Sequence, residues 1–375
     1  MKKGTALLLC AVMLASCSQS ESGDKAAEAE RVPVSQIYDG YDADDRFEHL
    51  VLPREITKQE LNEVYSLMIA AETPKDSEAK AKRVFKAFWG DSYDESRISC
   101  DDKQEYFDYD NGSDFGNYYA GSISLTRLYG SAVEAASNEP WLIGRDDSRS
   151  LDSIFPGTEL TAGMLAQSMP RDISDIVSEH EPDFDIQPYS ILDTTAGMEH
   201  YALLHYGLSY KGIPLQSFMS SLFEQYIEEG EKKLKSYAFS GIEARFDKDA
   251  QLVSVSTPSP LKLVSAERQE KLLSLGSAAR LLDSELAENI YYEIDDVQLM
   301  YCCKTVQPEL DVEKLGAERV KEICDELNRT PQLYEPTWCF IGNYQNGWQF
   351  AWSIKVNAIT GEVTIDAPKG VEKLK

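Results

Sequence analysis

The spacing of apolar residues in the first part of the chain predicts two helices followed by β structure. Residues 57–60 read Thr-Lys-Gln-Glu, the pattern of a capping box at a helix start. Apolar residues follow at helical spacing: Leu61, Val64, Tyr65, Met68 and Ile69. A second amphipathic run over 84–89 stops at Gly90, and segment 104–127 predicts β structure around the turn Asp110-Asn111-Gly112. We therefore expect a small N-terminal α+β region over 51–150.

The remainder of the chain repeats one order of elements. Between 151 and 260, helical segments at 160–169 and 172–180 precede a strand at 200–209 and a hairpin at 242–255. Between 261 and 368, helical segments at 265–275 and 277–288 precede a strand at 297–301 and a closing hairpin at 348–365. Segment 216–235 also fits a helix, although its pattern is ambiguous. The order predicts an α+β fold: tandem helix-on-antiparallel-sheet modules behind a smaller N-terminal helical/β region.

Strict alternation near the C-terminus predicts an antiparallel strand with one buried face. One side carries the apolar residues Trp348, Phe350, Trp352, Ile354 and Val356. We expect Trp352 to lie beneath the helix predicted over 265–288. In the alternative, tryptophans of this region line an exposed binding groove together with Tyr291, Tyr292 and Trp338.

Three short stretches of the C-terminal part resemble the ending of PepSY-like and cystatin-like modules. They are 297–301, Glu335-Pro-Thr-Trp338, and 356–363, which reads Val-Asn-Ala-Ile-Thr-Gly-Glu-Val. Such endings occur in extracytoplasmic accessory regulators of a cell-wall sensor kinase in Gram-positive bacteria. They also occur in an uncharacterised lipoprotein family of anaerobic Gram-positive bacteria, which the whole chain resembles most. The resemblance implies binding or inhibition of partners, and it transfers no catalytic residue.

The N-terminus resembles a bacterial lipoprotein signal. Lys2 and Lys3 precede an apolar run of ten residues, 6–15, which is too short for a spanning helix of about 20. Leu14-Ala15-Ser16-Cys17 is similar to a lipobox. The resemblance implies a signal peptide over 1–16 and acylation of the Cys17 sulfur, so that the acyl chains anchor the protein in membrane lipid. The alternative is an ordinary cleaved signal followed by an incidental cysteine.

The segment after the expected anchor has the composition of a tether. Residues 18–30 contain no apolar residue larger than alanine, and such a segment buries too little surface to fold. We expect a lipidated flexible tether over 17–50, folded regions over 51–150, 151–260 and 261–368, and a tail over 369–375.

Charge and cysteine content narrow the classes of function. The chain has 37 Lys+Arg and 64 Asp+Glu, and without Lys2 and Lys3 the balance becomes 35 minus 64, or −29. A surface this acidic repels nucleic acid, so we expect no nucleic-acid partner. Beyond Cys10 and Cys17, five cysteines remain: Cys100, Cys302, Cys303, Cys324 and Cys339. This sparse, odd set is not a disulfide framework, although one pair could be bridged.

Candidate metal-binding residues are scattered, and we expect no cofactor and no metal site. His200 and His205 stand five apart on a predicted strand and should face opposite sides, and His180-Glu181-Pro182 is not a zinc motif. Segment 108–114 hints at a calcium loop, but Gly112 occupies the fifth position, where an oxygen ligand is needed. A hairpin turn is the favoured interpretation.

Residues 77–80 contain one candidate catalytic motif. Ser77-Glu-Ala-Lys80 matches the Ser-x-x-Lys motif of penicillin-recognising enzymes, which pairs a nucleophile with a base one helical turn away. Tyr109-Asp-Asn111 could supply the second motif, but Lys304-Thr305-Val306 has valine where the third requires glycine. We therefore expect no catalytic residue. The expected function is that of a membrane-anchored extracytoplasmic lipoprotein with a non-catalytic binding or regulatory role on envelope proteins or peptides. The alternative is a cell-envelope serine acyl-transfer hydrolase using Ser77 and Lys80.

Overall fold

The fold was derived from a computed structural model of the chain. It describes the following residues: 29–41, 47–56, 58–71, 76–102, 106–119, 121–128, 131, 133–135, 141–142, 150–177, 184–216, 223–228, 231–236, 241–257, 259–286, 290–303, 315–316, 319, 322–323, 326, 330–342, 352–366 and 371–372.

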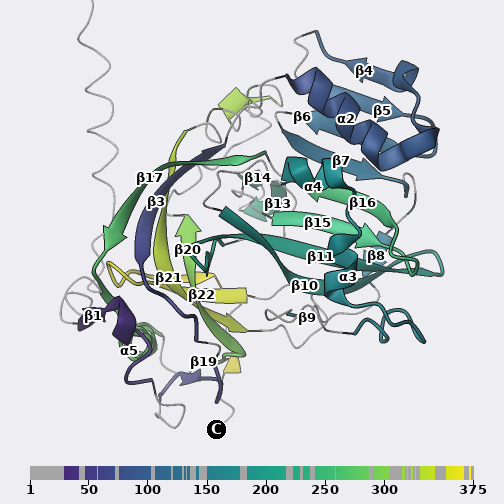
Figure 1. Ribbon diagram of the computed structural model, residues 1–375. Coiled ribbons are helices and arrows are strands. Elements are labelled where there is room, and N and C mark those ends of the chain that lie inside the picture. Colours follow the sequence, from purple (N-terminus) through teal and green to yellow (C-terminus); the bar gives the residue numbers. More distant parts are fainter. Residues whose placement is uncertain are drawn as a thin grey trace, which may run out of the picture.

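The protein is mostly β, with large antiparallel sheets and few helices, so the expected α+β fold of tandem helix-on-sheet modules is wrong. Figure 1 shows strands of one sheet coming from distant parts of the chain. Strand β3 (Val64–Ala71) lies between β17 (Leu261–Gln269) and β21 (Gln332–Gly342). The sheets are therefore assembled from non-consecutive segments rather than from two successive modules.

The larger sheet holds 11 strands among the described residues. Its main path runs β4 (Ile98–Cys100), β5 (Tyr106–Asp110), β6 (Phe115–Tyr119), β7 (Ser122–Thr126), β16 (Leu252–Thr257), β15 (Gly241–Phe246), β11 (Glu199–Tyr210), β10 (Phe184–Ala196) and β8 (Val133–Ala135). The short strands β12 (Ile213–Pro214) and β9 (Trp141–Leu142) pair with β11 and β10.

The second sheet has 6 strands within the same part of the chain. It runs β17, β3, β21, β22 (Trp352–Asn357) and β23 (Val363–Asp366), with β20 (Asp296–Cys303) on the other side of β21. Smaller ladders complete the β structure: β1 (Arg31–Pro33) with β18 (Lys271–Leu273), β13 (Phe223–Glu228) with β14 (Glu231–Ser236), and β19 (Ile290–Glu293) with β2 (Leu50–Val51) and β24 (Val371–Glu372).

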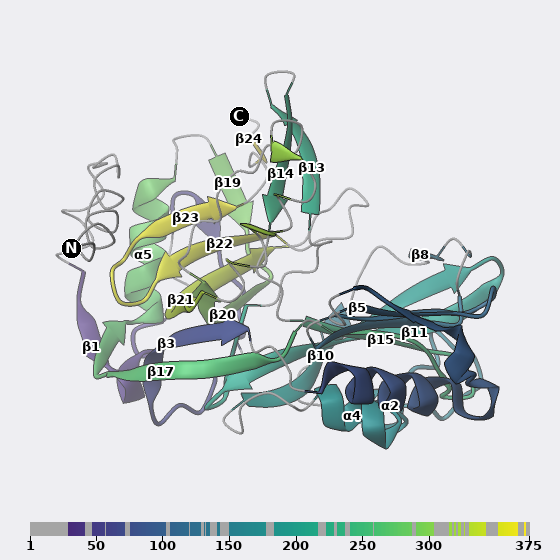
Figure 2. The ribbon, with the colours of Figure 1, turned by 90° about the horizontal axis from the view of Figure 1, so that it is seen from above.

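The α-helices of the described residues form two groups. Helices α2 (Ser77–Trp89), α3 (Ala162–Gln167) and α4 (Arg171–Val177) pack on one face of the larger sheet, and Figure 2 shows α2 and α4 on that side. Helix α5 (Leu275–Glu285) packs into the core of the second sheet. Three 3₁₀ helices are short: η1 (Val34–Gln36), η2 (Gly90–Ser92) and η3 (Glu95–Arg97).

Two predicted helices are strands in the structure. Segment 61–69 contains β3, and segment 265–275 mostly forms β17 and β18. In β3, Val64 and Ser66 are buried on one face, and Leu67 and Ile69 are buried on the other. A strand buried on both faces loses the two-residue alternation and becomes hard to distinguish from a helix.

Other sequence predictions are confirmed. Helix α2 ends before Gly90, which has φ +57°, and the strands β5, β6 and β7 surround the predicted hairpin turn. Helices α3 and α4 and the hairpin β15–β16 lie where the pattern placed them. The ambiguous segment 216–235 contains β13 and part of β14. In β22, Ile354 and Val356 are buried as expected, whereas the side chains of Trp348, Phe350 and Trp352 lie outside the described part.

Two hydrophobic cores hold the fold together. One lies between the larger sheet and helices α2, α3 and α4, and the other between the second sheet and α5. Strand β11 reaches from one core into the other, since Leu204 belongs to the first and Tyr210 to the second. Tyr210 contacts the ring of Tyr301, whose hydroxyl accepts a hydrogen bond from the backbone N–H of Tyr65 at 3.2 Å. This contact ties β11 to β20 and β3.

Candidate functional site

The larger sheet has one face that none of its three packed helices covers, and we call it the polar face. Alternation in the strands separates the two sides: Phe107 and Tyr109 of β5 enter the helix-covered core, while Tyr106 and Asp108 point the other way. A row of directly opposed polar residues crosses the polar face, from Asp108 through Asn117, Ser124, Ser256 and Glu243 to His205. With neighbouring strands about 4.8 Å apart, five steps make this row roughly 24 Å long.

The β11 end of the row is an electrostatic cluster. His205 is 2% exposed, and its Nε2 lies 3.7 Å from a carboxylate oxygen of Glu243. Burial, with a smaller contribution from Arg245, lowers the pKa of His205 to about 4. Burial also raises the pKa of Glu243, which the positive charge of Arg245 partly opposes. At neutral pH the imidazole is therefore uncharged, while Arg245 keeps its positive charge, as arginine does in proteins.

The β5 end of the row is more open and partly aromatic. Tyr106 and Tyr119 are half-buried, and their ring centroids lie 5.9 Å apart. Burial raises the pKa of Asp108, and Asp110 adds to this effect, whereas a hydrogen bond from Tyr106 lowers it. The open end can therefore offer both an acceptor and apolar ring surface to a partner.

Three buried polar atoms of this face lack hydrogen bonds to the described residues. They are Asp108 Oδ1, Arg245 Nε and Ser209 Oγ. Arg245 does donate through Nη1 to Ser254 Oγ at 3.2 Å, so its side chain is held in place while Nε stays unused. Buried polar atoms without partners cost stability, and such atoms are frequent where a ligand or partner completes the bonds.

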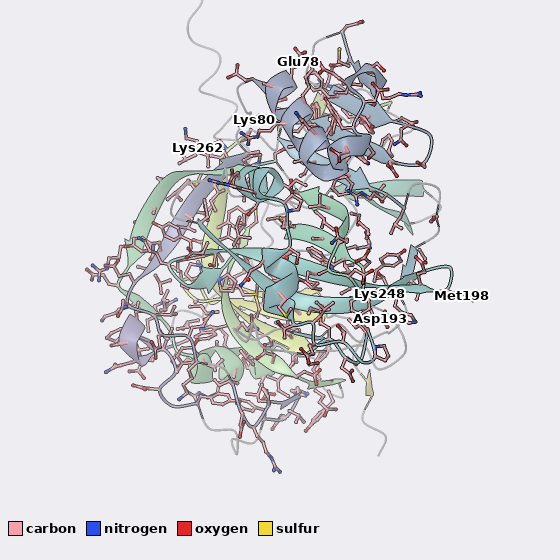
Figure 3. The ribbon with its side chains drawn as sticks, turned by 45° about the vertical axis from the view of Figure 1, so that its right-hand side comes forward. Glu78, Lys80, Asp193, Met198, Lys248 and Lys262 are labelled. Carbon is pink, nitrogen blue, oxygen red and sulfur yellow. The ribbon has the colours of Figure 1, made fainter. Side chains whose placement is uncertain are left out.

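Among the described residues, the Ser-x-x-Lys motif lies far from Tyr109 of the second predicted motif. Ser77 and Lys80 lie in the first turn of α2, where Figure 3 shows Lys80 close to Glu78. Tyr109 packs against the other end of this helix, with its ring 4.2 Å from that of Trp89. Because Trp89 is twelve residues beyond Ser77, the helix separates them by about 18 Å. The Tyr109 hydroxyl donates to the Ser92 carbonyl, and Lys304-Thr305-Val306 lies outside the described residues.

The remaining predicted site residues are dispersed. Cys17 lies outside the described residues. His200 is half-exposed, with Nδ1 2.9 Å from Asp193 Oδ1, and it faces the opposite side of β11 from His205. The Asn111 side chain accepts hydrogen bonds from Ser113 and Asp114 inside the β5–β6 turn, which confirms a hairpin turn.

Two of the described cysteines are in close contact. Cys302 Sγ and Cys339 Sγ lie 3.5 Å apart in the second sheet, both buried, and no disulfide joins them. Among the residues with assigned positions, no cluster of three or more histidine, cysteine or acidic side chains could hold a metal ion. In that same set, no helix is long and apolar enough to cross a membrane.

Sequence reasoning missed the polar row, although part of its signal was visible. Each of the segments 106–110, 115–119 and 122–126 alternates, and one side of 122–126 is Ser122, Ser124 and Thr126. The pairing of Ser124 with Ser256 joins residues 132 positions apart, and local pattern does not encode it. No protein-family model matches the chain, and no curated protein matches it either.

Proposed function

We propose that this protein is a membrane-anchored extracytoplasmic lipoprotein with a non-catalytic binding or regulatory role on envelope proteins or peptides. The observation that carries the proposal is the polar face, whose row of opposed polar side chains is partly exposed at every position from Asp108 to Glu243. The lipobox at Leu14–Cys17 supports the anchor and the compartment. Within the described residues, Tyr109 of the second motif packs at the far end of α2 from Ser77, which favours the binding role over the hydrolase alternative.

The polar face suits a protein or peptide partner better than a small molecule. Its row is roughly 24 Å long by strand spacing, and both donors and acceptors occur along it. Arg245 at one end would orient a partner through its charge, and Tyr106 and Tyr119 at the other would pack against it. Rigid strands hold all of these groups, so little conformational entropy is lost on binding.

Blocking the polar face should abolish partner binding. Asn117→Arg places a long charged side chain in the middle of the row, where Asn117 is half-buried between Asp108 and Ser124. The whole chain, purified from its own envelope after mild crosslinking, should retain a specific envelope protein. Recovery of that protein should fall roughly tenfold or more in the Asn117→Arg variant, because the long side chain would hold a partner away from the middle of the row.

Ala79→Arg is the matched control, because it adds the same side chain on an exposed position of α2, behind the opposite sheet face. It should leave recovery unchanged. Equal recovery from wild type and both variants would rule out the polar face as the binding surface. A covalent fluorophosphonate or penicillin adduct on Ser77 would instead favour the hydrolase.

Cys17→Ala should release the protein from the membrane or leave it as an unprocessed precursor. The thiol is the only atom of the lipobox that accepts the diacylglycerol, and each buried CH₂ of the acyl chains contributes about 0.8 kcal/mol to anchoring. Membrane fractionation with intact-mass measurement is the test, and Cys100→Ala, at an exposed position of β4, is the control. A Cys17→Ala protein that is fully processed and still sediments with membranes would show that the anchor assignment is wrong.

A further inference from the structure

Strand β17 is exposed to an unusual degree. It stands at the end of the second sheet, with β3 as its ladder partner, and Figure 1 shows it along the outer rim. Its five residues 264–268 are all exposed, and Val264 is 52% exposed. Because strand side chains alternate between two faces, five exposed residues in succession mean that both faces of β17 are open there.

The other ends of the two large sheets are short or partly occupied. Strands β4 and β8, which end the larger sheet's path, have 3 residues each, and β23 has 4, whereas β17 has 9. The 8-residue strand β20 is also an edge of the second sheet, but the Gln216 N–H donates to its Tyr301 carbonyl, so this edge is partly occupied. Short edge strands prevent unwanted pairing, while a long edge presents a row of unpaired peptide groups to another strand. Among the described sheet ends, β17 is therefore the one suited to adding a strand.

A β-bulge arranges the charges of β17 for self-pairing. Lys262 lies opposite Ala70, and Glu267 lies opposite Ser66, with Val264 as the extra residue between them. Ala70 and Ser66 are four residues apart in β3, so they share a face, and their partners Lys262 and Glu267 share it too. Without the bulge, two residues five apart would point to opposite faces.

We propose that β17 pairs antiparallel with β17 of a second copy of this chain, about a twofold axis that passes beside Val264 and Ser265. An axis perpendicular to the sheet brings residues of the same face together, so Lys262 of each copy lies opposite Glu267 of the other. Leu263 then lies opposite Ala266, and the exposed Val264 becomes covered at the centre. Figure 3 shows Lys262 at the exposed surface, where a second copy can reach it.

Charge complementarity is the reason to choose a second copy over another strand. Charged residues on an edge normally repel foreign strands. A copy of the same strand carries the complementary charges at the matching positions, and symmetry forms the Lys262–Glu267 pair twice. The short side chains of Ser265 and Ala266 leave room at the middle of the pairing. Anchoring both copies in one membrane would raise their effective concentration.

Charge reversal tests the pairing directly. Sedimentation equilibrium of the whole chain in density-matched detergent, up to its highest soluble concentration, should show a monomer–dimer equilibrium. Lys262→Glu and Glu267→Lys each place two like-charge pairs across the axis, so each should weaken the dimer roughly tenfold or more. The double variant restores opposite charges in reversed order, and it should recover the wild-type affinity. Lys248→Glu, in the distant β15–β16 turn, should leave the affinity unchanged.

A monomer at every concentration would overturn the proposal. So would a dimer that tolerates both single reversals, because its contacts would then lie elsewhere. Single variants that weaken the dimer without recovery in the double variant would reject this register. The result is independent of the polar face, since Lys262 and Glu267 lie on the second sheet.

Discussion

Trp338→Ala is expected to lower the free energy of unfolding by about 3–5 kcal/mol, the usual cost of truncating a large aromatic in a core. Trp338 is 0% exposed, its Nε1 donates to the Leu273 carbonyl at 2.9 Å, and its ring meets that of Tyr38 edge-on at 5.5 Å. The truncation leaves a cavity and an unpaired carbonyl at once. Because native proteins are stable by about 5–15 kcal/mol, the variant should unfold at a much lower urea concentration.

Urea unfolding of the whole chain, followed by circular dichroism, measures this loss without relying on the removed fluorophore. Ile365→Ala, at a 47% exposed position of the same sheet, is the control and should change stability by about 0.5 kcal/mol or less. Similar small losses from both variants would place Trp338 in an exposed groove instead. The buried position already argues against the groove interpretation for this tryptophan.

The second large effect is expected on acidification. The pKa of His205 in the folded protein is lowered to about 4 from the ordinary 6.5. As the pH falls, the unfolded chain therefore binds this proton before the folded chain does, and the folded state is penalised. The part of the folding stability that depends on a neutral His205 is fully present above pH 6.5, and it is lost as the pH falls from 6.5 to 4. A difference of 2.5 pKa units corresponds to about 3 kcal/mol.

Glu243 acts in the opposite direction, because a raised carboxyl pKa lets the folded state take up a proton before the unfolded state. Comparing the wild type with the His205→Gln variant separates the effect of His205 from that of Glu243, since both proteins keep Glu243 and Arg245. Urea unfolding at pH 7 and at pH 4.5 should show a smaller acid loss in the His205→Gln variant. The same acid loss in both proteins would mean that His205 is protonated in the folded state.

The two errors in the sequence interpretation have one physical origin. Segments 61–69 and 265–275 carry apolar residues at spacings that fit a helix, yet they form β3, β17 and β18. In β3, burial on both faces replaces the alternating pattern with a nearly continuous apolar run. In β17, the bulge at Val264 shifts the alternation by one residue halfway along the strand. Both effects remove the two-residue period on which strand prediction depends.

Local sequence by itself determined much of the secondary structure. The Gly90 stop of α2, the Asn111 turn between β5 and β6, and the alternating strands β11, β15 and β16 follow from hydrogen-bonding and periodicity within a few residues. Such interactions involve only residues that are close in sequence, so the local sequence is enough to predict them. The lipobox-like stretch Leu14–Cys17 is also a local pattern, and the anchor that it implies stays a prediction.

Only the tertiary structure decided which segments became neighbours. The polar row exists because β7 pairs with β16, which brings Ser124 opposite Ser256, and β15 pairs with β11, which brings Glu243 opposite His205. The second sheet joins β3 to β17 and β21, segments separated by about half of the chain or more. A strand can satisfy its backbone hydrogen bonds with any other strand, so its own residues do not determine which strand it pairs with. That choice is made by the burial of side chains from the whole chain in two shared cores.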